Sequence, residues 1–289
     1  MTNTELFPPL DSFELVPDFP ELAVPDANGI KVTEQPLDWD GPDDKDDPHN
    51  WPIWKKVFHS AIPAIYSFGL TTGISTSVAA LPFIMRQFQV TREVALLSIT
   101  LYTLGIIFGP LLCSPFSELY GRRMIYWTNF PMLVTFNAIA AASDSFAVLL
   151  AFRFLAGAGG SGVLAVGAGT ISDLWDSKDA GRVGLSYILA PFLGPTLGPL
   201  IGAYVIGQYD NDWKYAIWVL LMILAPVGLA IILMQETSKS RILYLRARRR
   251  GSYLDPQSKR AVMQKLGKAM LKPLHMCLFE VSFFQPCSN

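Results

Sequence analysis

The sequence of 289 residues has few of the side chains that build metal centres, disulfide frameworks or catalytic sites. Its three cysteines, Cys113, Cys277 and Cys287, form no CxxC pair, and its three histidines show no ligand spacing. Neither a disulfide framework nor a zinc site is supported. A GxxxxGKS phosphate loop, a nucleophile-base set and a dinucleotide-binding glycine motif are also missing. These absences argue against an enzyme and predict no cofactor, no metal and no nucleic-acid partner.

Charge is scarce where most of the chain lies. Residues 1–50 carry 13 acidic residues against two lysines, residues 51–234 carry 10 basic against 8 acidic residues, and residues 235–289 carry 11 against 3. The formal net charge of -1 is therefore the sum of an acidic head, an almost uncharged body and a basic tail. Because a helix that is apolar on all faces has no stable place in water, the body predicts membrane helices.

Six apolar runs in the body are each long enough to cross a hydrocarbon layer, which needs about 20 residues of helix. The six predicted spans are residues 57–85, 94–117, 124–143, 146–172, 183–209 and 215–235. We therefore expect an all-α membrane protein in which residues 51–235 form one six-helix transmembrane bundle. The lipid bilayer is its first predicted partner.

The flanking regions differ from the body in composition. Residues 1–50 combine eight prolines with many acids, which predicts a disordered head, and they lack the pattern of a signal peptide. Residues 236–273 predict a basic loop whose helical pattern over 256–272 fits either an amphipathic helix on an anionic membrane surface or a solvated linker. Residues 274–289 become apolar again, but Glu280 interrupts them and they are too short to span.

The placement of lysine and arginine predicts the orientation, since cytoplasmic loops carry an excess of both. If the head is cytoplasmic, the outer side holds only Arg86, Arg92 and Lys214. The inner side then holds Lys55, Lys56, Arg122, Arg123, Lys178, Arg182, Arg241, Arg246, Arg248, Arg249 and Arg250. We expect a multi-pass protein of the plasma membrane with both termini in the cytoplasm, as an even number of spans requires.

A tight polar turn separates the second and third runs. It reads SPFSELYGRR and ends in Gly121, Arg122 and Arg123. Glu118 offers an acceptor, and the two arginines offer donors that can meet Glu118 and Asp173, which lies at the end of the fourth run. We interpret these five residues as a charge cluster; the alternative is a helix stop that only fixes orientation.

Arg153 lies within the fourth run, a turn or two from its outer end. An arginine at a helix centre costs roughly 2.5 to 3.5 kcal/mol on insertion scales, so it needs a partner or a wet cavity. Because Arg153 is off centre, it could instead extend its side chain to the outer headgroups. The sequence leaves both interpretations open.

The fifth run contains repeated Gly-Pro pairs. Prolines remove helix hydrogen-bond donors and bend a helix, while glycines let a neighbouring helix approach closely. The residues of this bent-helix motif are Pro191, Gly194, Pro195, Gly198 and Pro199. A simple kink in a membrane helix is the alternative to a functional role.

Five segments together resemble the major facilitator superfamily. SPFSELYGRR resembles its loop between helices 2 and 3, and APFLGPTLGP in the fifth run is similar to the signature of its drug:proton antiporter branch. DWDGPDDKDDPHNWP before the first run resembles the fungal 12-helix members of that branch. FRFLAGAGGSG in the fourth run and QET after the sixth are also similar to family motifs. The turn departs from the family pattern at Ser114 and Glu118, where Gly and Asp are usual.

This resemblance implies a fold of two six-helix bundles with transport by alternating access. It implies proton-coupled multidrug efflux or polyamine-type antiport of small organic compounds, and this chain would supply the first bundle. The charge cluster would latch onto the second bundle, Arg153 would lie in the proton or substrate pathway, and the bent fifth helix would lie at the bundle interface. Residues 274–289 would begin a seventh helix.

Two other interpretations remain open. The chain could be a truncated membrane protein that at most binds or regulates a full-length relative, or two copies could make a complete pore. No Asp or Glu lies deep in any of the six runs. A carboxylate that couples transport to protons would therefore come from the missing half, unless Arg153 and tyrosines such as Tyr66, Tyr102 and Tyr187 modulate a site elsewhere.

Overall fold

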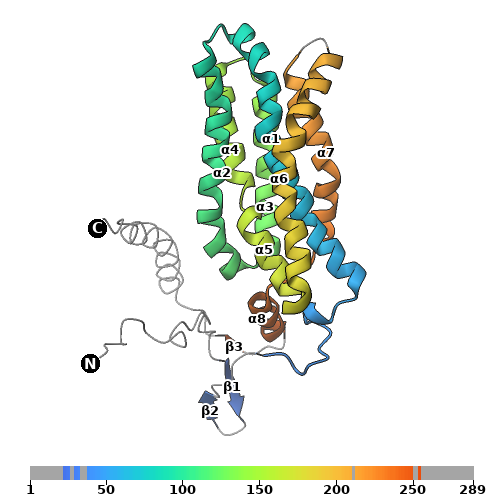
Figure 1. Ribbon diagram of the computed structural model, residues 1–289. Helices are drawn as coiled ribbons and strands as arrows, with labels where there is room; N and C mark the ends of the chain where they lie inside the picture. Colours follow the sequence, from blue (N-terminus) through green and yellow to red (C-terminus); the bar gives the residue numbers. More distant parts are fainter. Residues whose placement is uncertain (1–21, 27–28, 33–37, 210–211, 250–252, 255–289) are drawn as a thin grey trace, which may run out of the picture.

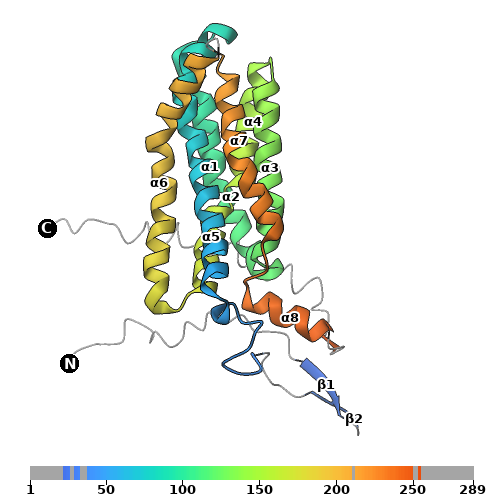
Figure 2. The ribbon, with the colours of Figure 1, turned by 90° about the vertical axis from the view of Figure 1, so that its right-hand side faces the viewer.

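The computed structural model describes residues 22–26, 29–32, 38–209, 212–249 and 253–254. Helices α1 to α7 form an elongated bundle, and α8 lies across one end of it (Figures 1 and 2). We call this the α8 end. The helices are α1 (Ile53–Phe88), α2 (Arg92–Tyr120), α3 (Arg122–Ala142), α4 (Phe146–Gly160), α5 (Val163–Leu174), α6 (Ser177–Gln208), α7 (Lys214–Leu233) and α8 (Lys239–Arg249). The helices expected at 256–272 and from 274 lie outside the described residues.

The helical membrane-type bundle predicted from the sequence is present, but the number of apolar spans differs. Five helical segments of the described chain are long and apolar enough to cross a membrane, rather than six. Helix α3 is the expected span that is missing from this set. Its Asn129 and Asn137 lower its hydropathy, yet they are only 5% and 0% exposed. Hydropathy averages all faces of a helix, so polar residues buried in the bundle lower it as much as exposed ones do.

The predicted fourth span consists of two helices on one line. Between α4 and α5 the chain makes a turn at Ser161 and Gly162, and together they count as one candidate span, Phe146–Leu174. The turn lies in a glycine-rich stretch, and glycine is a poor helix former. A side chain at Gly162 would meet the thiol of Cys113 at 2.7 Å and the amide of Asn129. Close packing therefore leaves no room for a side chain at Gly162.

Helices α1 and α6 pack against each other along much of their length. Gly194, Gly198 and Gly202 recur every four residues and form a buried face of α6 on α1. An added Cβ at Gly198 would meet the hydroxyl of Ser75 on α1. Ser75 Oγ also donates a hydrogen bond to the Gly194 carbonyl, at 3.1 Å. Small residues thus bring two helices into direct contact, as in many membrane bundles.

A second close contact joins α2 to α4. An added Cβ at Gly105 would meet the backbone carbonyl of Phe154 and the backbone nitrogen of Ala158, the latter at 2.7 Å. From the other side, Gly157 of α4 faces the carbonyl of Tyr102. Residues 104–111 read LGIIFGPL and residues 193–200 read LGPTLGPL. Two glycines four residues apart therefore occur both in α2, at its contact with α4, and in α6, at its contact with α1.

The N-terminal region is more structured than the sequence predicted. Strand β1 (Leu22–Asp26) pairs antiparallel with β2 (Gly29–Val32) and with β3 (Tyr253–Leu254). Residues 48–50 form the short 3-10 helix η2 (Pro48–Asn50). The prediction of a head disordered throughout is wrong for these segments. Composition describes how much apolar surface a segment can bury, but it does not show backbone pairing with a distant strand.

Candidate functional site

The turn between α2 and α3 is a single residue, Gly121, in a backbone conformation that favours glycine. Its φ is +92°. An added Cβ would also meet the carboxylate carbon of Glu236 at 2.7 Å and Cγ of Arg241 at 2.9 Å. Both the backbone angle and the space therefore require glycine here. This turn lies at the α8 end of the bundle (Figure 1).

Arg122 joins three helices at this end. Its Nε lies 3.1 Å from Oδ2 of Asp173 on α5, and its Nη1 donates to Oγ of Ser117 on α2 at 2.9 Å. The Arg122 and Asp173 side chains are 19% and 22% exposed. A side chain at Gly169 would meet the guanidinium carbon at 2.7 Å, so the arginine crosses α5 closely. The pair is partly removed from water and less screened than a surface ion pair.

Glu236 is the second centre of the cluster. One of its carboxylate oxygens accepts hydrogen bonds from the backbone N–H of Arg122 at 2.8 Å, Thr237 at 3.1 Å and Ser238 at 3.0 Å. The other accepts from the N–H of Arg123 at 3.2 Å. Arg122 and Arg123 open α3, where N–H groups lack helical partners and the helix dipole favours an anion. Thr237 and Ser238 immediately precede α8. One carboxylate therefore caps α3 and binds the backbone just before α8.

The structure brings together Gly121, Arg122 and Asp173, but not Glu118. Glu118 is exposed at the end of α2 and forms no ion pair among the described residues. The prediction that the two arginines meet Glu118 is wrong, because the Arg122 guanidinium binds Asp173 and Ser117 instead. The side chain of Arg123 points elsewhere, with its guanidinium 5.3 Å from the ring of Trp127.

Sequence reasoning did not include Glu236 among the candidate site residues. Its signal was available, since an acid followed by Thr237 and Ser238 just before a basic helix is a capping pattern. What the sequence could not show is that this carboxylate also caps α3. That contact depends on the folding of α7 back against α3.

Arg153 lies inside the bundle and is 2% exposed. Its Nη1 donates to the Gly73 carbonyl at 3.2 Å and its Nη2 to Ser77 Oγ at 2.6 Å, so it ties α4 to α1. The guanidinium carbon lies 5.3 Å from the ring centre of Tyr102 on α2. The alternative of a side chain that reaches the outer headgroups is wrong, because α1 offers both acceptors within the bundle.

Several polar atoms in the same interior have no partner among the described residues. They include Nε of Arg153, Oδ1 of Asn137 and the hydroxyl of Tyr66. Tyr102 donates its hydroxyl to the Leu70 carbonyl at 3.0 Å, and Tyr187 donates to the Val163 carbonyl at 3.0 Å. The tyrosines that the sequence singled out are therefore buried rather than exposed on a bundle face.

The bent-helix motif divides between two faces of α6. Gly194 and Gly198 are buried against α1, while Pro195 is exposed and Pro191 and Pro199 are half-buried. Despite its prolines, α6 continues as one helix from Ser177 to Gln208. The glycines act within the bundle, which leaves the proline face open for another contact.

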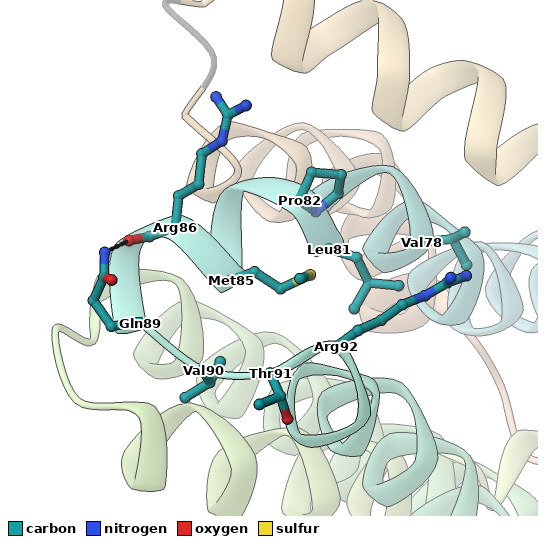
Figure 3. A pocket seen from close by; sticks show the side chains of 9 residues that line it. All are labelled: Val78, Leu81, Pro82, Met85, Arg86, Gln89, Val90, Thr91 and Arg92. Carbon is teal, nitrogen blue, oxygen red and sulfur yellow. Dashed lines mark hydrogen bonds between the residues drawn. The ribbon is translucent and has the colours of Figure 1, made fainter.

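An open hollow lies at the opposite end of the bundle, where α1 turns into α2 (Figure 3). Leu81, Met85 and Val90 are among its apolar lining residues, and Arg86 and Arg92 also line it. Gln89 turns the chain here with a φ of +53° and donates its amide to the Arg86 carbonyl at 2.7 Å. No predicted site residue lies in this hollow.

Comparison with known proteins gives a consistent assignment. Residues 64–284 match the Major Facilitator Superfamily. The chain is 32% identical over 263 residues to Polyamine transporter 4 of Saccharomyces cerevisiae, covering 89% of this chain and 39% of that protein. It is 34% identical over 215 residues to Efflux pump radE of Floropilus chiversii, covering 74% of this chain and 40% of that protein.

A solved structure agrees on the fold. The human organic anion transporter MFSD10 (TETRAN) superposes with a TM-score of 0.52 at 20% identity, over 65% of this chain and 49% of that chain. The chain spans about half or less of the length of these relatives. Because the family match covers more than half of its residues, the chain belongs to the major facilitator superfamily of membrane transport proteins and is not an enzyme.

Proposed function

We propose that this chain is the N-terminal six-helix half of a proton-coupled exporter of small organic compounds, drug-like or polyamine-like. The observation that carries the proposal is the family match over residues 64–284, combined with coverage of 39% and 40% of two relatives named as transporter and pump. A second six-helix half would complete the central cavity, and the two halves would alternate access to it.

In this proposal α3 crosses the membrane as the sixth span. Its asparagines are buried in the bundle, so its lipid-facing surface is more apolar than its sequence average. The α8 end would face the cytoplasm of a plasma-membrane protein, because most of the basic residues near the helix ends gather there. Arg86, Arg92 and Lys214 would face outward.

The charge cluster would act as a latch between conformations. Arg122, Asp173 and Glu236 join α2, α3, α5 and α8 at one end, and such half-buried bonds must rearrange if these helices tilt. We propose that the cluster contacts the second half and sets the balance between inward-open and outward-open states. Gly121 supplies the turn on which the cluster depends, and the exposed Arg123 and Glu118 remain available to the second half.

Arg153 would contribute to the proton or substrate pathway from inside the wall of the bundle. Its bonds to Gly73 and Ser77 hold α1 on α4, and its Nε is a free donor among the described residues. Movement of α1 away from α4 would also free Nη1 and Nη2 of Arg153 from their present acceptors. Replacement by Lys keeps the charge but loses the planar fork, so Arg153→Lys should reduce efflux while leaving the amount of folded protein unchanged.

The test is efflux from a yeast strain that lacks its own drug exporters. The 289-residue chain is expressed alone, and also joined in one reading frame to the coding sequence downstream of Asn289 where that encodes six further spans. We expect efflux of rhodamine 6G or spermidine only from the longer protein, abolished by a protonophore and reduced about tenfold or more by Asp173→Asn. An absence of efflux from both forms, with normal membrane insertion, would contradict the proposal.

A second candidate function is favoured by the partial coverage of the relatives. The chain would insert in the membrane without transporting, and bind or regulate a full-length relative. Co-purification with such a relative, with no efflux by the chain alone and a change in efflux by the relative, would support it. Efflux by the chain alone, with a native mass of two copies, would instead indicate a pore made from two halves.

A further inference from the structure

One arginine of α8 is enclosed by carboxylates from the segment that precedes α1. Arg246 binds Asp44 through both terminal nitrogens, at 2.7 Å each, and its Nη2 lies 2.6 Å from Oδ2 of Asp46. Asp40 adds a contact at 3.3 Å. The Arg246 and Asp44 side chains are 14% and 8% exposed. Two parallel bonds to one carboxylate fix geometry as well as charge.

A second fastening lies two turns earlier on α8. Lys239 Nζ lies 2.8 Å from Oδ1 of Asp38. The ring of Trp39 lies between the two fastenings in sequence, with its centre 5.8 Å from Lys239 Nζ and 5.8 Å from the guanidinium carbon of Arg246. Residues seven apart on a helix share a face, so both cations can bind the same short segment.

The segment is folded to present these carboxylates. The carboxylate of Asp44 accepts from the backbone N–H of Asp46 at 3.0 Å and of Asp40 at 3.2 Å. Asn50 donates its amide to the carbonyls of Pro42 at 2.7 Å and Asp44 at 3.0 Å. Hydrogen bonding to Arg246 holds the pKa of the Asp44 carboxyl well below its ordinary value of 3.8. The acceptor is therefore both preorganised and ionised.

The other end of the segment is tied to the bundle. Trp51 is 9% exposed and packs on the ring of His59 in α1, with centroids 5.0 Å apart. His59 Nε2 in turn accepts from the backbone N–H of Gln235 at 3.0 Å, next to Glu236. The segment thus binds α8 near its start, and at its other end Trp51 and His59 place it beside Gln235 and Glu236, which precede α8.

We propose that residues 38–50 form a strap, fastened at Arg246, that holds α8 across the end of the bundle and thereby positions Glu236, just before α8, at the first turn of α3. The strap is a positioning device, and the proposal does not depend on transport. It explains why an acidic segment before α1 and a basic helix after α7 are placed within reach of each other.

The test is hydrogen exchange by mass spectrometry on the 289-residue chain in lipid nanodiscs. Arg246→Gln is compared with Arg249→Gln, which removes the same charge from the same helix at an exposed residue with no ion pair among the described side chains. We expect Arg246→Gln to speed exchange about tenfold in peptides covering residues 44–51, and about threefold in peptides covering 121–124 and 237–243. Arg249→Gln should change both by less than about twofold.

Three outcomes would overturn the proposal. Equal effects of the two variants would show that only net charge matters. Faster exchange in the strap alone would show that Glu236 is positioned without it. The third outcome comes from a charge exchange, which guards against simple unfolding of α8. Arg246→Asp should release the strap, and adding Asp44→Arg to that variant should restore at least half of the lost protection against exchange. If the double variant restores no protection, the ion pair is not the fastening.

Discussion

Two close helix contacts in this bundle use the same eight-residue pattern but rest on different atoms. Between α2 and α4, Gly105 and Gly157 face only backbone atoms, which cannot rotate away, while Gly109 first meets the hydroxyl of Ser161. Between α1 and α6, Gly194 and Gly198 first face the hydroxyls of Thr71 and Ser75, although the backbone nitrogen of Thr72 also lies 2.7 Å from an added Cβ at Gly194. Backbone cannot yield without moving a helix, while a side chain can change rotamer. The first contact should therefore be the more rigid one at Gly105, and the second should tolerate more sliding at Gly198.

The largest expected effect is that of Gly105→Ala. The new methyl group would meet the backbone of Phe154 and Ala158, and such overpacking typically costs 1 to 3 kcal/mol. We expect about 3 kcal/mol loss in the free energy of unfolding, measured by denaturant titration in mixed micelles.

The matched control is Gly207→Ala near the end of α6, where an added Cβ would meet no atom within 4 Å. It should change the free energy of unfolding by less than about 0.5 kcal/mol. The gain in helix propensity is common to both variants, so equal changes in the free energy of unfolding would mean that close packing does not explain Gly105.

A smaller loss is expected from Gly198→Ala. The nearest obstacle is the side chain of Ser75, with its Cβ 2.9 Å from the added methyl group. We expect about 1.5 kcal/mol, and a smaller loss when Gly198→Ala is combined with Ser75→Ala than the two single losses predict. Strict additivity in this double-mutant cycle would show that the hydroxyl is not the obstacle.

Smaller still is the effect of Ser75→Ala alone. It removes the hydrogen bond from Ser75 Oγ to the Gly194 carbonyl, and such bonds in membrane bundles average about 0.6 kcal/mol. The same titration measures it. A loss above about 2 kcal/mol would contradict the view that this contact can slide.

The smallest expected effect is a dependence of stability on pH. The charged α8 end should show it, and the two glycine contacts should not. The glycine contacts contain no titrating group, so their ranking should not change with pH. Asp44 behaves differently because its pKa is lowered by Arg246. The stability that it contributes is fully present above its ordinary pKa of 3.8 and is lost as pH falls through the lowered folded value.

Asp44→Asn therefore should cost about 0.5 kcal/mol near pH 6 and progressively less as pH falls below 3.8. Unfolding titrations of both proteins at a series of pH values measure this difference. A difference that grows on acidification would contradict the assigned sign.

Parts of the candidate site were readable from the sequence. A turn of Gly121, Arg122 and Arg123 between the second and third apolar runs predicted donors at one bundle end. Asp173 was predicted as their partner from its place at the end of the fourth run. Glu118 was the wrong acceptor because the sequence shows which residues are near in order, not which face of a helix they occupy. Glu236 lies more than a hundred residues from the turn that it caps, and such a pairing requires the folded bundle.

The sequence by itself determined that this chain forms apolar helices in a membrane, with charge apart from Arg153 confined to their ends and glycine and proline repeating in the fifth run. These properties follow from local composition, because lipid accepts only backbones that satisfy their own hydrogen bonds. Only the tertiary structure decided that Arg153 turns inward to α1, that the Glu236 carboxylate caps α3, and that Arg246 binds the acidic segment before α1. Each of these contacts joins residues distant in sequence, and their geometry depends on how the helices pack.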